Sequence, residues 1–145
     1  MVFALTLLGS SASCDREPGA EAATAVPGMV EVAPHGDHTP RYGGVVFMHG
    51  DLHFEVVLAP DGRHRIYFSD ASRAELPASV ASDVTVTITT GTTGSRALDA
   101  RIDQAGESWI AEGAPVADPL ATARIAFVSG GGPYFIDVPF ATVAP

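Results

Sequence analysis

The stretch of sequence that decides the fold is residues 42–58, which run YGGVVFMHGDLHFEVVL. Two runs rich in apolar residues flank Gly50-Asp51, and a glycine in the first loop position suits the positive φ that tight hairpin turns require. The pattern predicts a β-hairpin with a two-residue loop. The predicted pairs are Val45 with Val56, Val46 with Glu55, Phe47 with Phe54, Met48 with His53 and His49 with Leu52.

This register gives the hairpin two chemically different faces, because successive side chains of a strand point to opposite sides. A three-residue loop would place His53 opposite Phe47 and mix the two faces, so the alternation favours the two-residue loop. The apolar face carries Val45, Phe47, Phe54, Val56 and Leu58. The other face carries Val46, Met48, His53 and Glu55.

A third strand is predicted at residues 64–69, after a turn at residues 59–63 that contains Pro60 and Gly62. With Leu58 opposite His64, the same two faces continue onto this strand. The apolar face then pairs Val56 with Ile66 and Phe54 with Phe68. The polar face pairs Glu55 with Tyr67 and His53 with Ser69.

The rest of the chain shows turn signals and short alternating runs, and it has no convincing helix. Residues 84–89 alternate between apolar residues and threonine with a period of two. Further strands are predicted at residues 96–103, 108–111, 123–128 and 134–140. About eight short strands at this spacing predict an all-β fold, an antiparallel β-sandwich of immunoglobulin-like type, with a β-barrel as the alternative.

The first 40 residues differ in composition from the rest of the chain. Residues 1–14 begin with a short apolar run and continue with small residues before Cys14, a pattern similar to a bacterial signal peptide with a lipobox. It predicts export to the periplasm or cell envelope, with a lipid anchor on Cys14; an ordinary N-terminal segment with an incidental cysteine is the alternative. Residues 15–40 are polar and proline-rich, which predicts a flexible linker before a domain at 41–145.

Composition argues against several classes of function. The net charge is −9 and all eight basic residues are arginine. An acidic chain without a basic cluster is a poor candidate for binding nucleic acid or an anionic membrane surface. Gly130-Gly131-Gly132 precedes proline and a strand, so it is not a phosphate-binding loop, and no nucleophile elbow occurs. The sequence therefore predicts a protein that is not an enzyme.

All five histidines lie between positions 35 and 64. Imidazole binds copper and zinc, and a thioether shifts the preference towards Cu(I). We therefore expect a metal site, for copper first and zinc or another divalent ion second. His64 is expected at the solvent-exposed far end of the hairpin, away from this site. The predicted ligands are His49, His53 and Met48, with His38 and His35 on the N-terminal arm as auxiliary ligands.

Part of the sequence resembles a known family. Gly43-Gly44-Val45-Val46, residues 50–57, residues 65–70 and Leu76-Pro77 are similar to a small bacterial β-domain. That domain occurs alone in exported proteins and near the N-terminus of heavy-metal efflux adaptors. The resemblance implies a periplasmic protein associated with copper or another heavy metal. Tyr42 stands where the family has a histidine before Gly-Gly, which leaves His38 or His49 to take that ligand's place.

Two functions follow as hypotheses. The first is an exported, membrane-tethered β-sandwich that binds a metal and passes it to a protein partner in the envelope; the confinement of the histidines favours it. The second is a non-catalytic accessory module that docks on a larger envelope complex, with incidental histidines; the tyrosine at position 42 favours that alternative.

Overall fold

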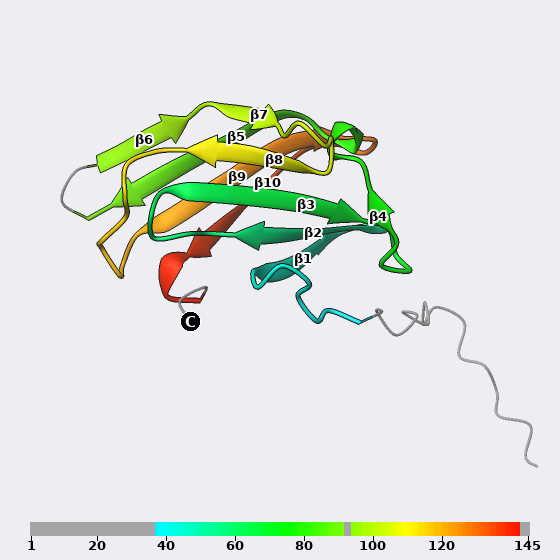
Figure 1. Cartoon of the computed structure of the whole chain (residues 1–145), viewed down its shortest axis with the longest axis horizontal. Coiled ribbons are helices and arrows are strands. Elements are labelled where there is room, and N and C mark those ends of the chain that lie inside the picture. Colours follow the sequence, from blue (N-terminus) through cyan, green and yellow to red (C-terminus); the bar gives the residue numbers. More distant parts are fainter. Residues whose placement is uncertain (1–36, 92–93, 143–145) are drawn as a thin grey trace, which may run out of the picture. The chain divides into compact units, whose positions relative to one another are not determined.

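Two antiparallel sheets pack against each other in the computed structural model, which describes residues 37–91 and 94–142 (Figure 1). All of these residues belong to one compact unit. The described part contains ten strands and two short 3₁₀ helices, Ala78–Val80 and Phe140–Thr142. The predicted all-β sandwich is confirmed.

The first sheet has the strand order β1-β2-β3-β8-β7, and the short strand β4 pairs beside β3. All of its pairings are antiparallel. Its strands are β1 (Val45–His49), β2 (Leu52–Val57), β3 (Arg63–Ser69), β4 (Glu75–Leu76), β7 (Ala100–Ile102) and β8 (Ser108–Glu112).

The second sheet has the strand order β10-β9-β5-β6, again entirely antiparallel. The register of β5 against β9 shifts between Ser82 and Thr85. Its strands are β5 (Ser82–Thr90), β6 (Gly94–Leu98), β9 (Thr122–Ser129) and β10 (Gly132–Pro139).

The strand order matches the immunoglobulin-like prediction. In that fold one sheet has the order A-B-E-D and the other contains G-F-C, extended by C′ in variable-type domains. Taking β2 as strand A, the order β2-β3-β8-β7 reproduces A-B-E-D, and β10-β9-β5-β6 reproduces G-F-C-C′. Strand β1 is then an addition at the outer edge of the first sheet, and it exists because the opening hairpin pairs it with strand A.

Ten strands form instead of about eight, partly because the predicted strand at residues 96–103 divides at Asp99. Its first part continues β6 and pairs with β5 in the second sheet, whereas Ala100–Ile102 pairs with β8 in the first. The apolar pattern on both sides of Asp99 fits a strand, so the sequence does not reveal that the chain changes sheets there.

The predicted hairpin register is confirmed at every one of its five pairs, from Val45 opposite Val56 to His49 opposite Leu52. Gly50 has a φ of 61°, the conformation that the two-residue loop requires of its first residue. The four predicted pairs between residues 53–56 and the third strand are also confirmed. The alternation of the two faces therefore persists across β1, β2 and β3.

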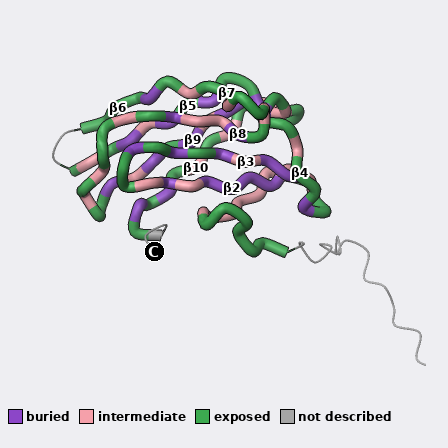
Figure 2. The backbone as a smooth tube through the Cα atoms, in the orientation of Figure 1, coloured by how far each residue is buried: buried purple, intermediate pink, exposed green. Residues whose placement is uncertain are grey.

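The apolar face of this hairpin packs into the core between the sheets. Figure 2 shows buried residues along β2 and β3. The Phe127 ring of β9 meets the rings of Phe54 and Phe68 edge-on, with centroids 5.2 and 5.4 Å away. Full burial of such a side chain contributes about 1.5–3 kcal/mol relative to leaving it exposed. These three rings join β2 and β3 to the opposite sheet.

His64 is buried, so the expectation that it lies at a solvent-exposed edge is wrong. Its exposed fraction is 1%, its ring meets that of Phe140 edge-on at 5.7 Å, and its Nδ1 accepts the Ala59 N–H at 3.3 Å. The predicted face was correct, since His64 shares the inner face with Ile66 and Phe68. The burial comes from the C-terminal 3₁₀ helix, whose contact with β3 the local sequence does not show.

Because burial lowers the pKa of His64 below the ordinary value of 6.5, the folded protein resists its protonation. The unfolded chain binds that proton near pH 6.5. The free energy of unfolding is therefore highest, as far as His64 is concerned, above that pH, and it decreases as the pH falls below it. The slope reaches at most about 1.4 kcal/mol per pH unit for one proton. Urea unfolding of wild type and His64→Gln between pH 8 and pH 5 measures this: the variant has the shallower pH dependence, and equal slopes would contradict the assignment.

Candidate functional site

The outer face of the first hairpin brings three of the predicted ligands together. Met48 on β1 is paired with His53 on β2, so their side chains share this face. The arm before β1 places His38 beside both residues. His38 Nε2 lies 2.8 Å from Met48 Sδ, and the ring centroids of His38 and His53 are 5.4 Å apart. Two imidazoles and a thioether therefore converge at one point on the surface of the sheet.

His53 is unusual because it is polar, only 2% exposed and poorly partnered. Neither of its ring nitrogens has a hydrogen-bond partner of good geometry within the described residues, although backbone groups of Asp70 and Asp51 lie near enough to act on the ring. Burial lowers the pKa of its imidazole below the usual range, and the charge of Arg73 acts in the same direction, while backbone groups of Asp70 and Asp51 oppose the shift. A buried polar group without a partner is costly, so this ring is available to a ligand.

Strand β2 is covered on both of its faces, since the four consecutive residues from His53 to Val56 are all buried. The opposite sheet covers Phe54 and Val56, which belong to the apolar core. The arm covers the other side. The last four residues of the predicted linker, 37–40, therefore contact the domain, whereas the remainder of residues 15–40 lies outside the described part.

Glu55 holds the arm against β2. Its Oε2 accepts the N–H of Arg41 at 2.7 Å, and its Oε1 accepts the N–H groups of Tyr42 and Gly44, each at 2.8 Å. The side chain is 3% exposed, so three backbone donors take the place of water around a buried carboxylate. A side chain at Gly44 would collide with the Val56 carbonyl, because a Cβ there would lie 2.3 Å from its oxygen. The arm thus runs in direct backbone contact with β2.

Two further contacts hold the arm on either side of Arg41. The buried Arg73 donates from Nη2 to the Thr39 carbonyl at 3.0 Å. Tyr42 stacks on Tyr67 with ring centroids 3.6 Å apart, and its hydroxyl donates to Glu75 Oε1 at 2.7 Å. Tyr42 is therefore an anchor of the arm, turned towards β3 and β4.

His49 lies on the other face of the hairpin, so the structure does not bring it to the other predicted ligands. Its ring is 4.3 Å from that of Tyr134 on β10, and Tyr134 in turn meets Phe54 edge-on. His49 pairs with Leu52, whereas His53 pairs with Met48, and neighbouring pairs point to opposite faces. The prediction that made His49 and His53 ligands of one metal ion did not take this alternation into account.

Two residues that the sequence singled out, the auxiliary ligand His35 and the lipidation site Cys14, lie outside the described residues. Within the described ranges, no helix is long and apolar enough to cross a membrane. The same ranges contain no cluster of three or more His, Cys, Asp or Glu side chains that could hold a metal ion. The converging set differs from such a cluster because its third member is a methionine.

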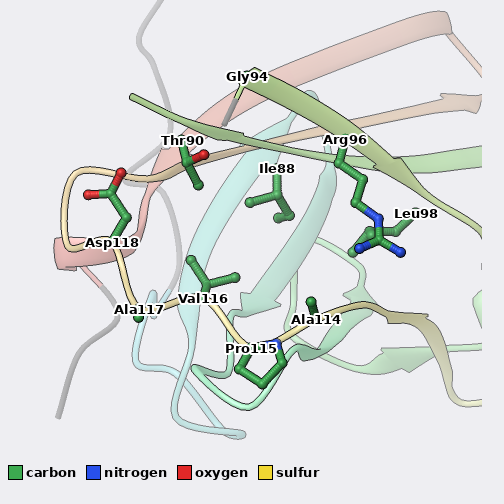
Figure 3. Close-up of a pocket in the computed structure, with 10 residues that line it drawn as sticks. All are labelled: Ile88, Thr90, Gly94, Arg96, Leu98, Ala114, Pro115, Val116, Ala117 and Asp118. Atoms are coloured by element: carbon green, nitrogen blue, oxygen red, sulfur yellow. The ribbon is translucent and has the colours of Figure 1, made fainter. Parts of the chain in front are cut away.

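A pocket of about 400 Å³ lies away from these residues, between β5, β6 and the loop that follows β8 (Figure 3). Ile88, Leu98 and Val116 give it an apolar floor, and Arg96 lies beside it. The carboxylate of Asp118 at its other end already accepts the N–H groups of Gly91 and Leu120. The pocket contains none of the predicted ligands and no converging set of free polar groups.

Comparison with known proteins found no match to this chain among family models, curated proteins or solved structures.

The contact between Tyr42 and Glu75 can be measured directly. The hydrogen bond to Glu75 and partial burial raise the pKa of Tyr42 to about 12 from an ordinary 10.0. Glu75→Gln removes the negative charge that opposes phenolate formation, so the pKa of Tyr42 is expected to fall towards 10. Absorbance titration of the phenolate gives the value, with Tyr42→Phe identifying the transition and circular dichroism confirming that the fold persists. An unchanged pKa in Glu75→Gln would show that the arm is not docked there.

Proposed function

We propose that this protein binds a soft metal ion, copper as Cu(I), on the outer face of its first hairpin through His38, Met48 and His53. The observation that carries the proposal is the convergence of these donors on a buried imidazole that has no hydrogen-bond partner among the described residues. Without a metal, the contact between His38 and Met48 is a hydrogen bond to sulfur. With a metal, the same three side chains serve as its ligands.

The spacing of the donors supports a shared ion. Nitrogen and sulfur ligands bind metals such as zinc at about 2.0–2.3 Å, so two donors of one ion lie no more than about 4.3 Å apart. The 2.8 Å between His38 Nε2 and Met48 Sδ falls within that limit. His53 follows on the neighbouring strand, paired with Met48, and its ring centroid lies 5.4 Å from that of His38.

The chemistry of the donors favours Cu(I) over the divalent alternatives. The set has two imidazoles and a thioether but no thiolate and no carboxylate, and thioether is a ligand that selects Cu(I). Because all three donors are neutral, they do not offset the charge of a bound cation. The charge of Arg73 acts on His53, and this repulsion penalises a divalent ion more than a monovalent one.

The proposed role is binding and delivery rather than catalysis. A site on the outer face of a sheet, covered by the docked arm, suits an ion that enters and leaves when the arm moves. Export and a lipid anchor on Cys14 would place such a site in the cell envelope beside a partner that receives the metal. These parts of the proposal rest on the N-terminal sequence and on the family resemblance.

A competition titration with a colorimetric Cu(I) chelator tests the site. The full chain is used with Cys14→Ser, because a free thiol would itself bind Cu(I). His53→Ala is expected to weaken binding by at least about 100-fold. That loss exceeds the range typical of substitutions at residues that support the ligands without touching the metal. His49→Ala is the matched control and should leave the affinity unchanged. Failure of the parent chain to bind Cu(I) at micromolar concentration, or equal binding by His53→Ala, would favour the docking-module alternative.

The thioether can be tested separately. Met48→Leu keeps the side-chain volume and removes only the sulfur. It is expected to reduce the affinity for Cu(I) about tenfold or more and to leave that for Zn(II) nearly unchanged. Parallel titrations with the two ions measure the ratio. An equal loss for both ions would mean that Met48 acts through packing, and His35→Ala in the same series reports whether the auxiliary ligand contributes.

A further inference from the structure

We infer that Glu55 is a positioning residue for the proposed metal site: it touches no metal, but it fixes the arm that carries His38. The inference rests on the proposed function and adds the device that assembles the site. His53 and Glu55 lie two residues apart on β2 and therefore share its outer face. His53 binds the ion, and Glu55 binds the arm that carries His38.

The geometry links the carboxylate to His38 through a short piece of chain. The first backbone group that Glu55 binds is Arg41 N–H, three residues after His38. Three residues span at most about 10 Å when fully extended. Fixing Arg41 on β2 therefore confines His38 to the neighbourhood of His53 and Met48. Arg73, through its hydrogen bond to the Thr39 carbonyl, narrows that range further.

A carboxylate fits the three donors, whereas an amide does not. Arg41, Tyr42 and Gly44 present N–H groups to both oxygens, and a carboxylate accepts at all of its lone pairs. Glutamine at this position has one oxygen and one NH₂ group, so at least one N–H would face another donor. Hydrogen bonds to a buried charged group are stronger than those between neutral groups, and an unpaired buried donor is costly. Replacing Glu55 by glutamine should therefore loosen the arm.

The arm and the ion are then thermodynamically linked. A docked arm supplies His38 to the metal, and a bound metal that ties His38 to β1 and β2 holds the arm down. By linkage, each event favours the other by the same free energy. Metal binding should accordingly slow hydrogen exchange at the backbone amides of Arg41, Tyr42 and Gly44, which donate hydrogen bonds to Glu55. Those amides report the position of the arm without reference to the affinity.

The central experiment compares Glu55→Gln with its parent, the full chain with Cys14→Ser. The expected loss of Cu(I) affinity is about 10- to 100-fold, the usual range for residues that support metal ligands without touching the metal. Exchange at the three arm amides should be faster in the variant. Glu112→Gln is the matched control, because it removes the same charge from β8, where its partner is the exposed Arg101. It should change neither quantity.

A double-mutant cycle separates positioning from general destabilisation. If Glu55 acts through His38, then Glu55→Gln causes little further loss in a His38→Ala background. Full additivity of the two losses would overturn the inference. Arg41→Pro is a second variant should Glu55→Gln fail to fold, because it deletes the N–H that Glu55 Oε2 accepts and leaves β2 intact. Arg41→Pro should weaken Cu(I) binding, as Glu55→Gln does.

The outcomes distinguish the two proposals. If the parent binds Cu(I), His53→Ala abolishes binding and Glu55→Gln matches the parent, then the proposed function stands and the role of Glu55 is wrong. If the parent binds no Cu(I), the proposed function fails and the metal-positioning role of Glu55 falls with it. Amide exchange in Glu55→Gln still reports in that case whether the carboxylate holds the arm, as a purely structural contact.

Discussion

The strict alternation of side chains along β2 is the constraint on which the rest of the structure depends. Phe54 and Val56 point into the core, where Phe54 meets Phe127 of the opposite sheet. Their neighbours His53 and Glu55 are thereby forced onto the outer face. A slip of the register by one residue would bury the imidazole and the carboxylate in the core and expose the rings. Packing of the apolar residues therefore also decides where the polar ones lie.

That outer face explains the arm. A sandwich normally leaves the outer side of each sheet to water, yet His53 and Glu55 are both buried. The backbone of residues 41–44 satisfies the carboxylate, and the stacked pair of Tyr42 and Tyr67 covers the adjoining surface. The imidazole is left without an equivalent partner among the described residues. This difference between the two buried polar groups is the reason for assigning one to structure and the other to a ligand.

The candidate site was predictable in part. The pairing of Met48 with His53 follows from the register, which the sequence specifies through its two-sided pattern, and His38 was expected to fold back. The same alternation excludes His49, whose face is set by its pairing with Leu52. The contact of Glu55 with the arm gave no sequence signal, because the donors are backbone groups of a segment with no periodicity. Arg73, which lies far along the chain from Thr39, was likewise not predictable.

The sequence by itself determined most of the strands, the hairpin register and the immunoglobulin-like class, because all three depend on short-range alternation and turn chemistry. Tertiary structure alone decided what covers each surface. His64 is buried by Phe140, the chain changes sheets at Asp99, and the arm closes over β2. These contacts join segments distant in the sequence. Their free energy depends on how well the packed surfaces fit and on which backbone groups lack a partner, and the local pattern of apolar and polar residues encodes neither.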